Sequence, residues 1–206
     1  MENVKKILLA AVIVLQVGIA FGQTDAAYQK AFSDSYANEY NKKYNDAIGD
    51  LTRLNDENSY EVNLRLGWLY YLNKNYAQST AHYQKSVNMK PYAVEAKFGL
   101  IKPLSVQESW DKVLQLYSDI LKIDPQNSTA NYWAGVINYN RKKYEPASKL
   151  FEKAVNLYPF DYDGTHMLAW TYLGMGRNND AKVLFNKALL MRPADASALS
   201  GLAKIK

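Results

Sequence analysis

Apolar residues along most of this chain recur at helical spacing, in paired segments separated by short polar turns. One such segment is 61–72, whose apolar face consists of Val62, Leu66, Leu69 and Tyr70. A polar turn at 73–75 follows, and apolar residues resume at Tyr83 and Val87. Apolar positions three and four residues apart mark one face of a helix, and clustered asparagines mark a turn. The pattern therefore predicts two helices joined by a tight turn.

The same pattern returns with a fixed period. Four prolines, each 34 residues after the one before, are Pro91, Pro125, Pro159 and Pro193. Eight places before them stand the aromatic residues Tyr83, Tyr117, Phe151 and Phe185, and twelve places before them stand the small or apolar residues Ser79, Val113, Ala147 and Ala181. A period of about 34 that contains two helices predicts stacked helix-turn-helix repeats, in which each repeat buries its apolar face against a neighbour.

These positions resemble the tetratricopeptide repeat family. The residues that carry the resemblance are Leu66, Gly67, Tyr70, Tyr144, Ala147, Phe151, Ala154 and Pro159. The resemblance covers roughly 27–206 and implies an all-α fold, a right-handed solenoid of about five helix-turn-helix units with a C-terminal capping helix. The expected repeats are about 28–59, 60–93, 94–127, 128–161 and 162–193, with the cap at 194–206.

Two places depart from the regular pattern. In the first repeat Ser59 stands where the proline is expected, and Tyr44 precedes Tyr76 by 32 residues. We therefore expect an atypical end unit there, as terminal repeats often are. Pro103 falls inside the first predicted helix of the third repeat, where its ring and missing N–H predict a kink near 101–104.

The N-terminal 22 residues have the features of a signal peptide. Lys5 and Lys6 precede an apolar stretch at 7–20, and small residues at Ala20 and Gly22 fit a cleavage site. We expect cleavage after Gly22, a mature domain at 23–206 without a transmembrane span, and export to the periplasm of a bacterial envelope. The alternative is an uncleaved segment that anchors the protein in the membrane. The chain has no cysteine, so neither a disulfide nor a lipidated cysteine is available.

The charge of the chain bears on the kind of partner it can bind. The net charge of +5 is mild, and the basic residues predicted to lie at turns are Lys42, Lys43, Lys74, Arg141, Lys142, Lys143 and Arg177. They are either an edge for an anionic partner or simply solvated turns. The mild charge and the expected export argue against a nucleic-acid partner.

Candidate catalytic groups are sparse in this sequence. Only two histidines occur, His82 and His166, and neither has a second ligand at metal-binding spacing. No glycine-rich phosphate loop follows a predicted strand. We therefore predict no catalytic site, no metal and no cofactor, and a protein that is not an enzyme.

The resemblance implies that the first helix of each repeat lines a concave surface. The residues it places there as partner-binding candidates are Trp68, Tyr71, Phe98, Lys102, Tyr132, Tyr139, His166 and Trp170. Most are aromatic, which suits binding anchors but equally suits packing between repeats. The predicted function is a non-catalytic scaffold or adaptor of the cell envelope that binds a peptide of a partner protein. The alternative is a glycan-binding accessory module of an envelope polysaccharide system.

Overall fold

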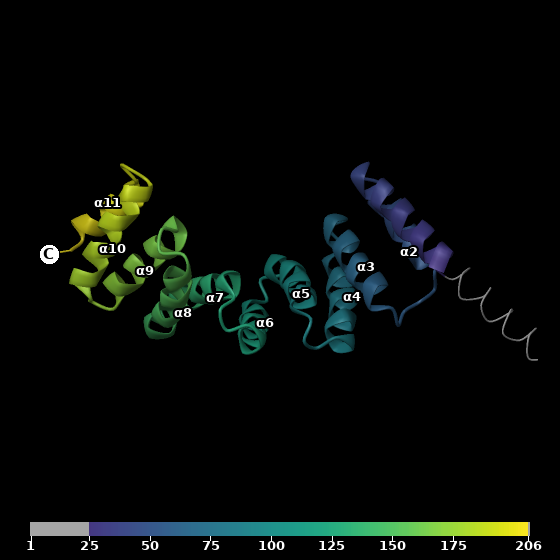
Figure 1. The fold of residues 1–206 in the computed structure, drawn as a ribbon, viewed down its shortest axis with the longest axis horizontal. Coiled ribbons are helices and arrows are strands. Elements are labelled where there is room, and N and C mark those ends of the chain that lie inside the picture. The colour runs from purple at the N-terminus through teal and green to yellow at the C-terminus, as the bar shows by residue number, and fades with distance from the viewer. Residues whose placement is uncertain (1–24, 206) are drawn as a thin grey trace, which may run out of the picture. The chain divides into compact units, whose positions relative to one another are not determined.

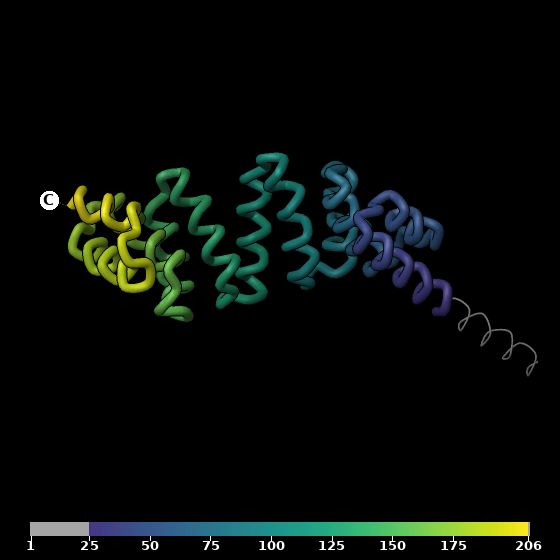
Figure 2. The backbone as a smooth tube through the Cα atoms, turned by 90° about the horizontal axis from the view of Figure 1, so that it is seen from above, coloured from purple at the N-terminus to yellow at the C-terminus, as the bar shows by residue number. Residues whose placement is uncertain are grey.

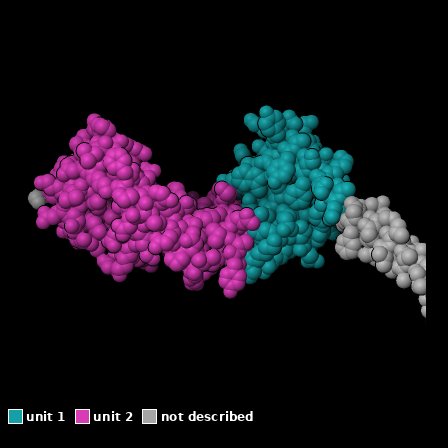
Figure 3. Space-filling view, in the orientation of Figure 1, with its two compact units in different colours: residues 1–91 teal, residues 92–206 magenta. Residues whose placement is uncertain are grey.

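A computed structural model describes residues 25–205, and these residues form helices and turns without a strand. Contacts between residues divide the chain into two compact units, one ending at Pro91 and the other beginning at Tyr92 (Figure 3). The all-α, helix-turn-helix prediction is confirmed.

Unit 1 contains a helix at 25–40, followed by α2 (Tyr44–Thr52), α3 (Tyr60–Leu72) and α4 (Tyr76–Met89) (Figure 1). Helix α3 packs against both α2 and α4. The apolar core of this unit lies between the helix at 25–40, α2 and α3. Its buried apolar residues are Ala31, Ala47, Ile48, Leu51, Val62, Leu66 and Leu69. The first repeat thus has a regular apolar core even though its sequence pattern is weak.

Unit 2 consists of seven helices among its described residues, which are α5 (Val94–Val106), α6 (Trp110–Ile123), α7 (Ser128–Asn140), α8 (Tyr144–Leu157), α9 (Tyr162–Gly174), α10 (Asn178–Met191) and α11 (Ala196–Ala203). Each helix packs against the next one along the chain, as the backbone trace shows (Figure 2). Helix α11 contacts both α10 and α9. Because helices that are neighbours in sequence are also neighbours in space, residues 34 positions apart occupy equivalent packing positions in successive repeats.

The turns within the helix pairs share one backbone conformation. A positive φ of 55–76° occurs at Lys74, Glu108, Lys142 and Gly176, and also at Lys42 with 59°. At Lys142 the backbone N–H donates to the carbonyl of Tyr139 at 2.8 Å, and the next N–H, of Lys143, donates to Asn138 at 2.9 Å. This pair of bonds closes a helix C-terminus, where a basic side chain also complements the helix dipole. Three of these five positions are lysines, at Lys42, Lys74 and Lys142, whereas Glu108 and Gly176 occupy the same turn position.

Pro103 lies in the last turn of α5, and its ring is fully buried. The helix continues through it to Val106, and the Pro103 carbonyl accepts the N–H of Gln107 at 3.0 Å. Because proline has no N–H, α5 lacks the one internal hydrogen bond that residue 103 would donate to the carbonyl of Gly99. The buried ring contributes to the core of unit 2.

Two buried asparagines fix the loops that precede their helices. The Nδ2 of Asn63 donates to the carbonyls of Glu57 and Ser59, both at 2.8 Å. The Nδ2 of Asn131 donates likewise to Pro125 at 3.1 Å and Asn127 at 3.0 Å. A buried amide that satisfies two loop carbonyls stabilises the entry to the repeat. Neither asparagine belongs to the apolar and aromatic pattern from which the repeats were predicted.

Glycine substitutions should have opposite effects at two helical sites. A Cβ added to Gly135 would lie 2.7–3.0 Å from three atoms of the Phe151 ring, so we expect Gly135→Ala to destabilise unit 2 by about 1–3 kcal/mol. At Gly49, within α2, a Cβ would meet nothing within 4 Å, so Gly49→Ala should stabilise unit 1 by about 0.5–1 kcal/mol. Urea denaturation of both variants measures the two effects. Equal shifts would contradict the close contact between Gly135 and the Phe151 ring.

Candidate functional site

The predicted site residues of unit 1 are Trp68 and Tyr71 on α3. Their rings stack at a centroid distance of 5.8 Å, and both side chains are half-buried. The indole Nε1–H of Trp68 donates to Glu39 Oε1 at 2.7 Å, and Glu39 also pairs with the buried guanidinium of Arg65. Trp68 is therefore already part of an internal polar network. Its role in binding stays a prediction.

Phe98, Lys102 and Tyr139 are separate positions in unit 2. Phe98 is half-buried on α5 and meets the Tyr117 ring edge-on at 6.4 Å, whereas Lys102 on the same helix is exposed. Tyr139 on α7 lies against Tyr144 at 5.6 Å. These aromatic contacts lie within single helix pairs, so they contribute to packing whatever else the rings do.

His166 and Trp170 lie together on α9, and both contact α11. The Nε1–H of Trp170 donates to His166 Nε2 at 3.0 Å and lies 3.1 Å from Ser197 Oγ, which itself lies 2.8 Å from His166 Nε2. The Trp170 ring meets Phe185 edge-on at 5.2 Å. Because Nε2 accepts a hydrogen bond, the neutral Nδ1–H tautomer of His166 is favoured. Both side chains thus help to dock the C-terminal helix.

Both histidines should make stability depend on pH. Burial is the main cause that lowers the pKa of His82 and of His166 below the usual 6.5. The unfolded chain then binds protons more readily than the folded chain. The free energy of unfolding is therefore highest above pH 6.5 and decreases as the pH drops below it. Urea midpoints between pH 7.5 and 5 should show this decline, and the double variant His82→Gln with His166→Gln should flatten it. A wild-type midpoint that is constant over this range would contradict the lowered pKa values.

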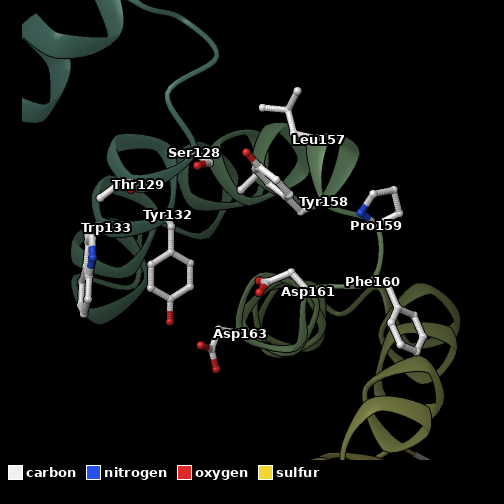
Figure 4. Close-up of a pocket in the computed structure, with 11 residues that line it drawn as sticks. Ser128, Thr129, Tyr132, Trp133, Leu157, Tyr158, Pro159, Phe160, Asp161 and Asp163 are labelled. Atoms are coloured by element: carbon white, nitrogen blue, oxygen red, sulfur yellow. The ribbon is translucent and has the colours of Figure 1, made fainter.

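Unit 2 also contains a pocket of about 720 Å³ at the start of α7, the end of α8 and the loop that leads into α9 (Figure 4). Its principal walls are formed by Tyr132, Trp133, Tyr158, Phe160, Asp161 and Asp163. Of the predicted site residues, Tyr132 alone lines this pocket. The other seven lie elsewhere.

Large apolar side chains around the pocket are unusually exposed. The exposed fractions are 47% for Trp133, 57% for Tyr158 and 71% for Phe160. Tyr132 is half-buried between two rings, because it meets Trp133 edge-on at 5.2 Å and Phe151 at 5.9 Å. Phe151 belongs to the core, so the wall of the pocket is supported directly by it. Exposed apolar clusters of this kind mark interaction surfaces.

The polar side of the pocket is acidic. Asp161 caps α9, with its Oδ2 accepting the N–H of Gly164 at 2.8 Å. Asp163 Oδ1 lies 3.5 Å from Nη2 of Arg192. The pKa of Tyr132 is raised, chiefly by burial and then by the charges of Asp163 and Asp161. Both carboxylates therefore favour the neutral form of the Tyr132 hydroxyl.

A local signal for this pocket was present in the sequence. The loop proline Pro159 is flanked by two aromatic residues, Tyr158 and Phe160. At the other three repeat prolines the flanking residues are mostly polar or small, and Tyr92 is the one aromatic among them. Both Tyr158 and Phe160 are exposed in the structure.

Among the described residues, no group of three or more His, Cys, Asp or Glu side chains is placed to hold a metal ion. In the same part of the chain, no helix combines the length and apolar character needed to cross a membrane.

The helix-turn-helix pairs define a protein built from α-helical repeats. Family models for the tetratricopeptide repeat match residues 60–92, 129–161 and 165–195. The chain therefore contains tetratricopeptide repeats, as the sequence predicted. It is also 25% identical, over 134 residues, to anaphase-promoting complex subunit 3 of Schizosaccharomyces pombe. That alignment covers 60% of this chain and only 20% of the relative.

Solved structures show the same fold. The structure of MamA matches with a TM-score of 0.72 and 17% identity, over 80% of this chain and 91% of that one. A tetratricopeptide repeat protein from Parabacteroides merdae matches with a TM-score of 0.75 and 16% identity, over 87% and 72% of the two chains. YrrB, a repeat protein with an unusual peptide-binding site, matches with a TM-score of 0.70 and 14% identity, over 82% and 89%. At these identities the likeness concerns the fold alone.

Proposed function

We propose that this protein is a non-catalytic scaffold that binds a peptide segment of a partner protein, and that the pocket of unit 2 is a binding surface. The observation that carries the proposal is the exposure of Trp133, Tyr158 and Phe160 around one concave site. Exposing three large rings is unfavourable unless a partner covers them. Rigid aromatic side chains are also the usual anchors of protein interfaces.

The surroundings of the pocket support a peptide ligand. The site is lined by side chains from two helix pairs, whose packing fixes its shape before any ligand arrives, and a preformed surface lowers the entropic cost of binding. The similarity to YrrB, which has a peptide-binding site, supports the same class of ligand. The aromatic residues predicted from the sequence on α3, with Trp68 foremost, are a second candidate surface in unit 1.

Photo-crosslinking tests the proposed surface. A photoreactive residue in place of Phe160 should give a discrete protein adduct in cells, and Tyr158→Ala in the same chain should weaken it. The matched control replaces Val183, which is 66% exposed on α10. Equal adducts at both positions, or none at Phe160, would contradict the proposal. An adduct with carbohydrate in place of protein would favour the glycan-binding alternative, for which exposed rings beside carboxylates are also suitable.

We further propose that the scaffold acts in the cell envelope after removal of residues 1–22, which lie outside the described residues. The support is the basic and apolar pattern of the sequence from Lys5 to Gly22. Mass spectrometry of the protein from fractionated cells should find a chain that begins at Gln23. A chain that retains Met1 in the membrane fraction would instead support the uncleaved anchor, and one confined to the cytosol would contradict export.

A further inference from the structure

The pocket of unit 2 has a charge that differs from that of the whole chain. The protein carries a net charge of +5, yet the lining of this pocket includes two aspartates and neither lysine nor arginine. Arg192, at the C-terminal end of α10, lies 3.5 Å from Asp163. That contact is long and both side chains are more than half exposed, so it neutralises little of the charge.

Acceptor groups converge on the centre of the pocket. The Oδ2 of Asp161 accepts the hydrogen bond that caps α9, and the Oδ1 of Asp163 pairs with Arg192. Within the described chain, each carboxylate thus keeps one oxygen without a hydrogen-bond donor, and the Tyr132 hydroxyl has no partner there either. Figure 4 shows the Tyr132 hydroxyl pointing toward Asp163, with Asp161 facing it from the start of α9. Together these groups present acceptors to a ligand that brings donors.

Aromatic rings flank these acceptors. Figure 4 shows Tyr132 beside the two carboxylates, Tyr158 above Asp161, and Trp133 beyond Tyr132. Aromatic faces attract cations through their quadrupole, and more strongly where the cation is partly desolvated. Carboxylates beside aromatic rings therefore favour a positively charged group with an apolar stem.

We propose that this pocket binds a lysine or arginine side chain of the partner, with a neighbouring apolar residue of the partner covering Trp133 or Tyr158. This inference rests on the proposed function, because it names the ligand class of the same site. An acidic segment would place its charge against two carboxylates, and a wholly apolar one would desolvate them without a counter-charge. A basic and apolar segment satisfies both the rings and the acids.

The test uses three capped hexapeptides that are identical except at one central position, which is lysine, glutamine or glutamate before a leucine. Binding to the purified protein is followed by NMR through the indole signal of Trp133 and the amides of Ser128 and Thr129, which also line the pocket. We expect saturable shifts with the lysine peptide, at least about tenfold weaker binding of the glutamine peptide, and none with the glutamate peptide. Added salt should weaken the lysine peptide most.

Variants separate the charge from the shape. Asp163→Asn and Asp161→Asn keep the volume, and asparagine also keeps the cap on α9, so both should reduce the advantage of lysine over glutamine without unfolding the protein. The matched control is Asp111→Asn, which removes one exposed carboxylate on α6 that pairs with Arg141. This control should leave peptide binding unchanged.

The outcomes distinguish the two proposals. Equal binding of the lysine and glutamine peptides at the pocket would overturn the preference for a cation and leave the peptide scaffold standing. Failure of every peptide to move the pocket signals would overturn the inference, and the crosslink at Phe160 then decides the scaffold separately. Shifts with a neutral oligosaccharide but with no peptide would overturn both.

Discussion

Phe151→Ala should destabilise unit 2 by about 3–5 kcal/mol, whereas the same substitution at Phe160 should cost less than about 0.5 kcal/mol. Phe151 is 0% exposed in α8 and belongs to a buried cluster with Ala147, Val155 and Leu168. Its ring lies directly over Gly135, so removing it leaves a cavity that the helix backbone cannot close. Phe160 is 71% exposed and leaves no cavity.

Urea denaturation of both variants, monitored by circular dichroism, gives the difference in midpoint. Because the chain has two units, a second transition can appear, and the one that moves in Phe151→Ala belongs to unit 2. Similar losses for the two variants would mean that the Phe151 ring is not the centre of this core. Phe160→Ala should at the same time weaken the proposed partner binding, since its ring lines the pocket.

The buried aromatic positions were predictable from the sequence. Tyr83, Tyr117, Phe151 and Phe185 recur at the 34-residue period, and all four are buried, with exposed fractions of 0–7%. In a chain of repeats, local helical spacing determines which face is buried, and the period determines what that face meets. Both are properties of the sequence alone, so the helix pairs and their core could be predicted together.

The binding surface could not be predicted in the same way, because aromatic residues occupy first-helix positions for two different reasons. Trp170 has the spacing of a groove residue, yet its ring packs on Phe185, and its N–H contacts His166 on α9 and Ser197 on α11. Trp133 directly follows the predicted site residue Tyr132, and its exposure depends on the path of the loop after α8. Spacing within one helix does not reveal what a later segment covers.

Buried polar contacts were also beyond the sequence pattern. Asn63 and Asn131 stand two periods apart, but nothing in a single chain marks an asparagine as a partner for loop carbonyls. The structure also shows a difference between them. The Oδ1 of Asn63 lies 2.9 Å from Nδ1 of His82, whereas the buried Oδ1 of Asn131 has no partner within the described chain.

Truncation after Ala194, which removes α11, should lower the stability of unit 2 by about 2–4 kcal/mol and reduce its solubility. Ala198 and Gly201 are the buried residues of α11, and the half-buried Leu202 and Ile205 pack against the cluster of Ala181, Phe185 and Ala188. Each large apolar side chain contributes about 1.5–3 kcal/mol when fully buried, and less when half-buried. The truncation also exposes the last apolar face of the repeats, which favours aggregation.

A point substitution tests the same contact in the intact chain. A Cβ on Gly201 would clash with the ring of Phe185, so Gly201→Val should displace α11 and lower the thermal midpoint in the same direction as the truncation. The matched control Leu199→Val changes an exposed side chain of the same helix, at 48% exposure, and should have little effect. If the truncated protein and Gly201→Val both melt like the wild type, α11 does not cover the core of the last repeat. If they melt early while the Trp133 indole signal is unchanged, the cap stabilises that repeat without shaping the pocket.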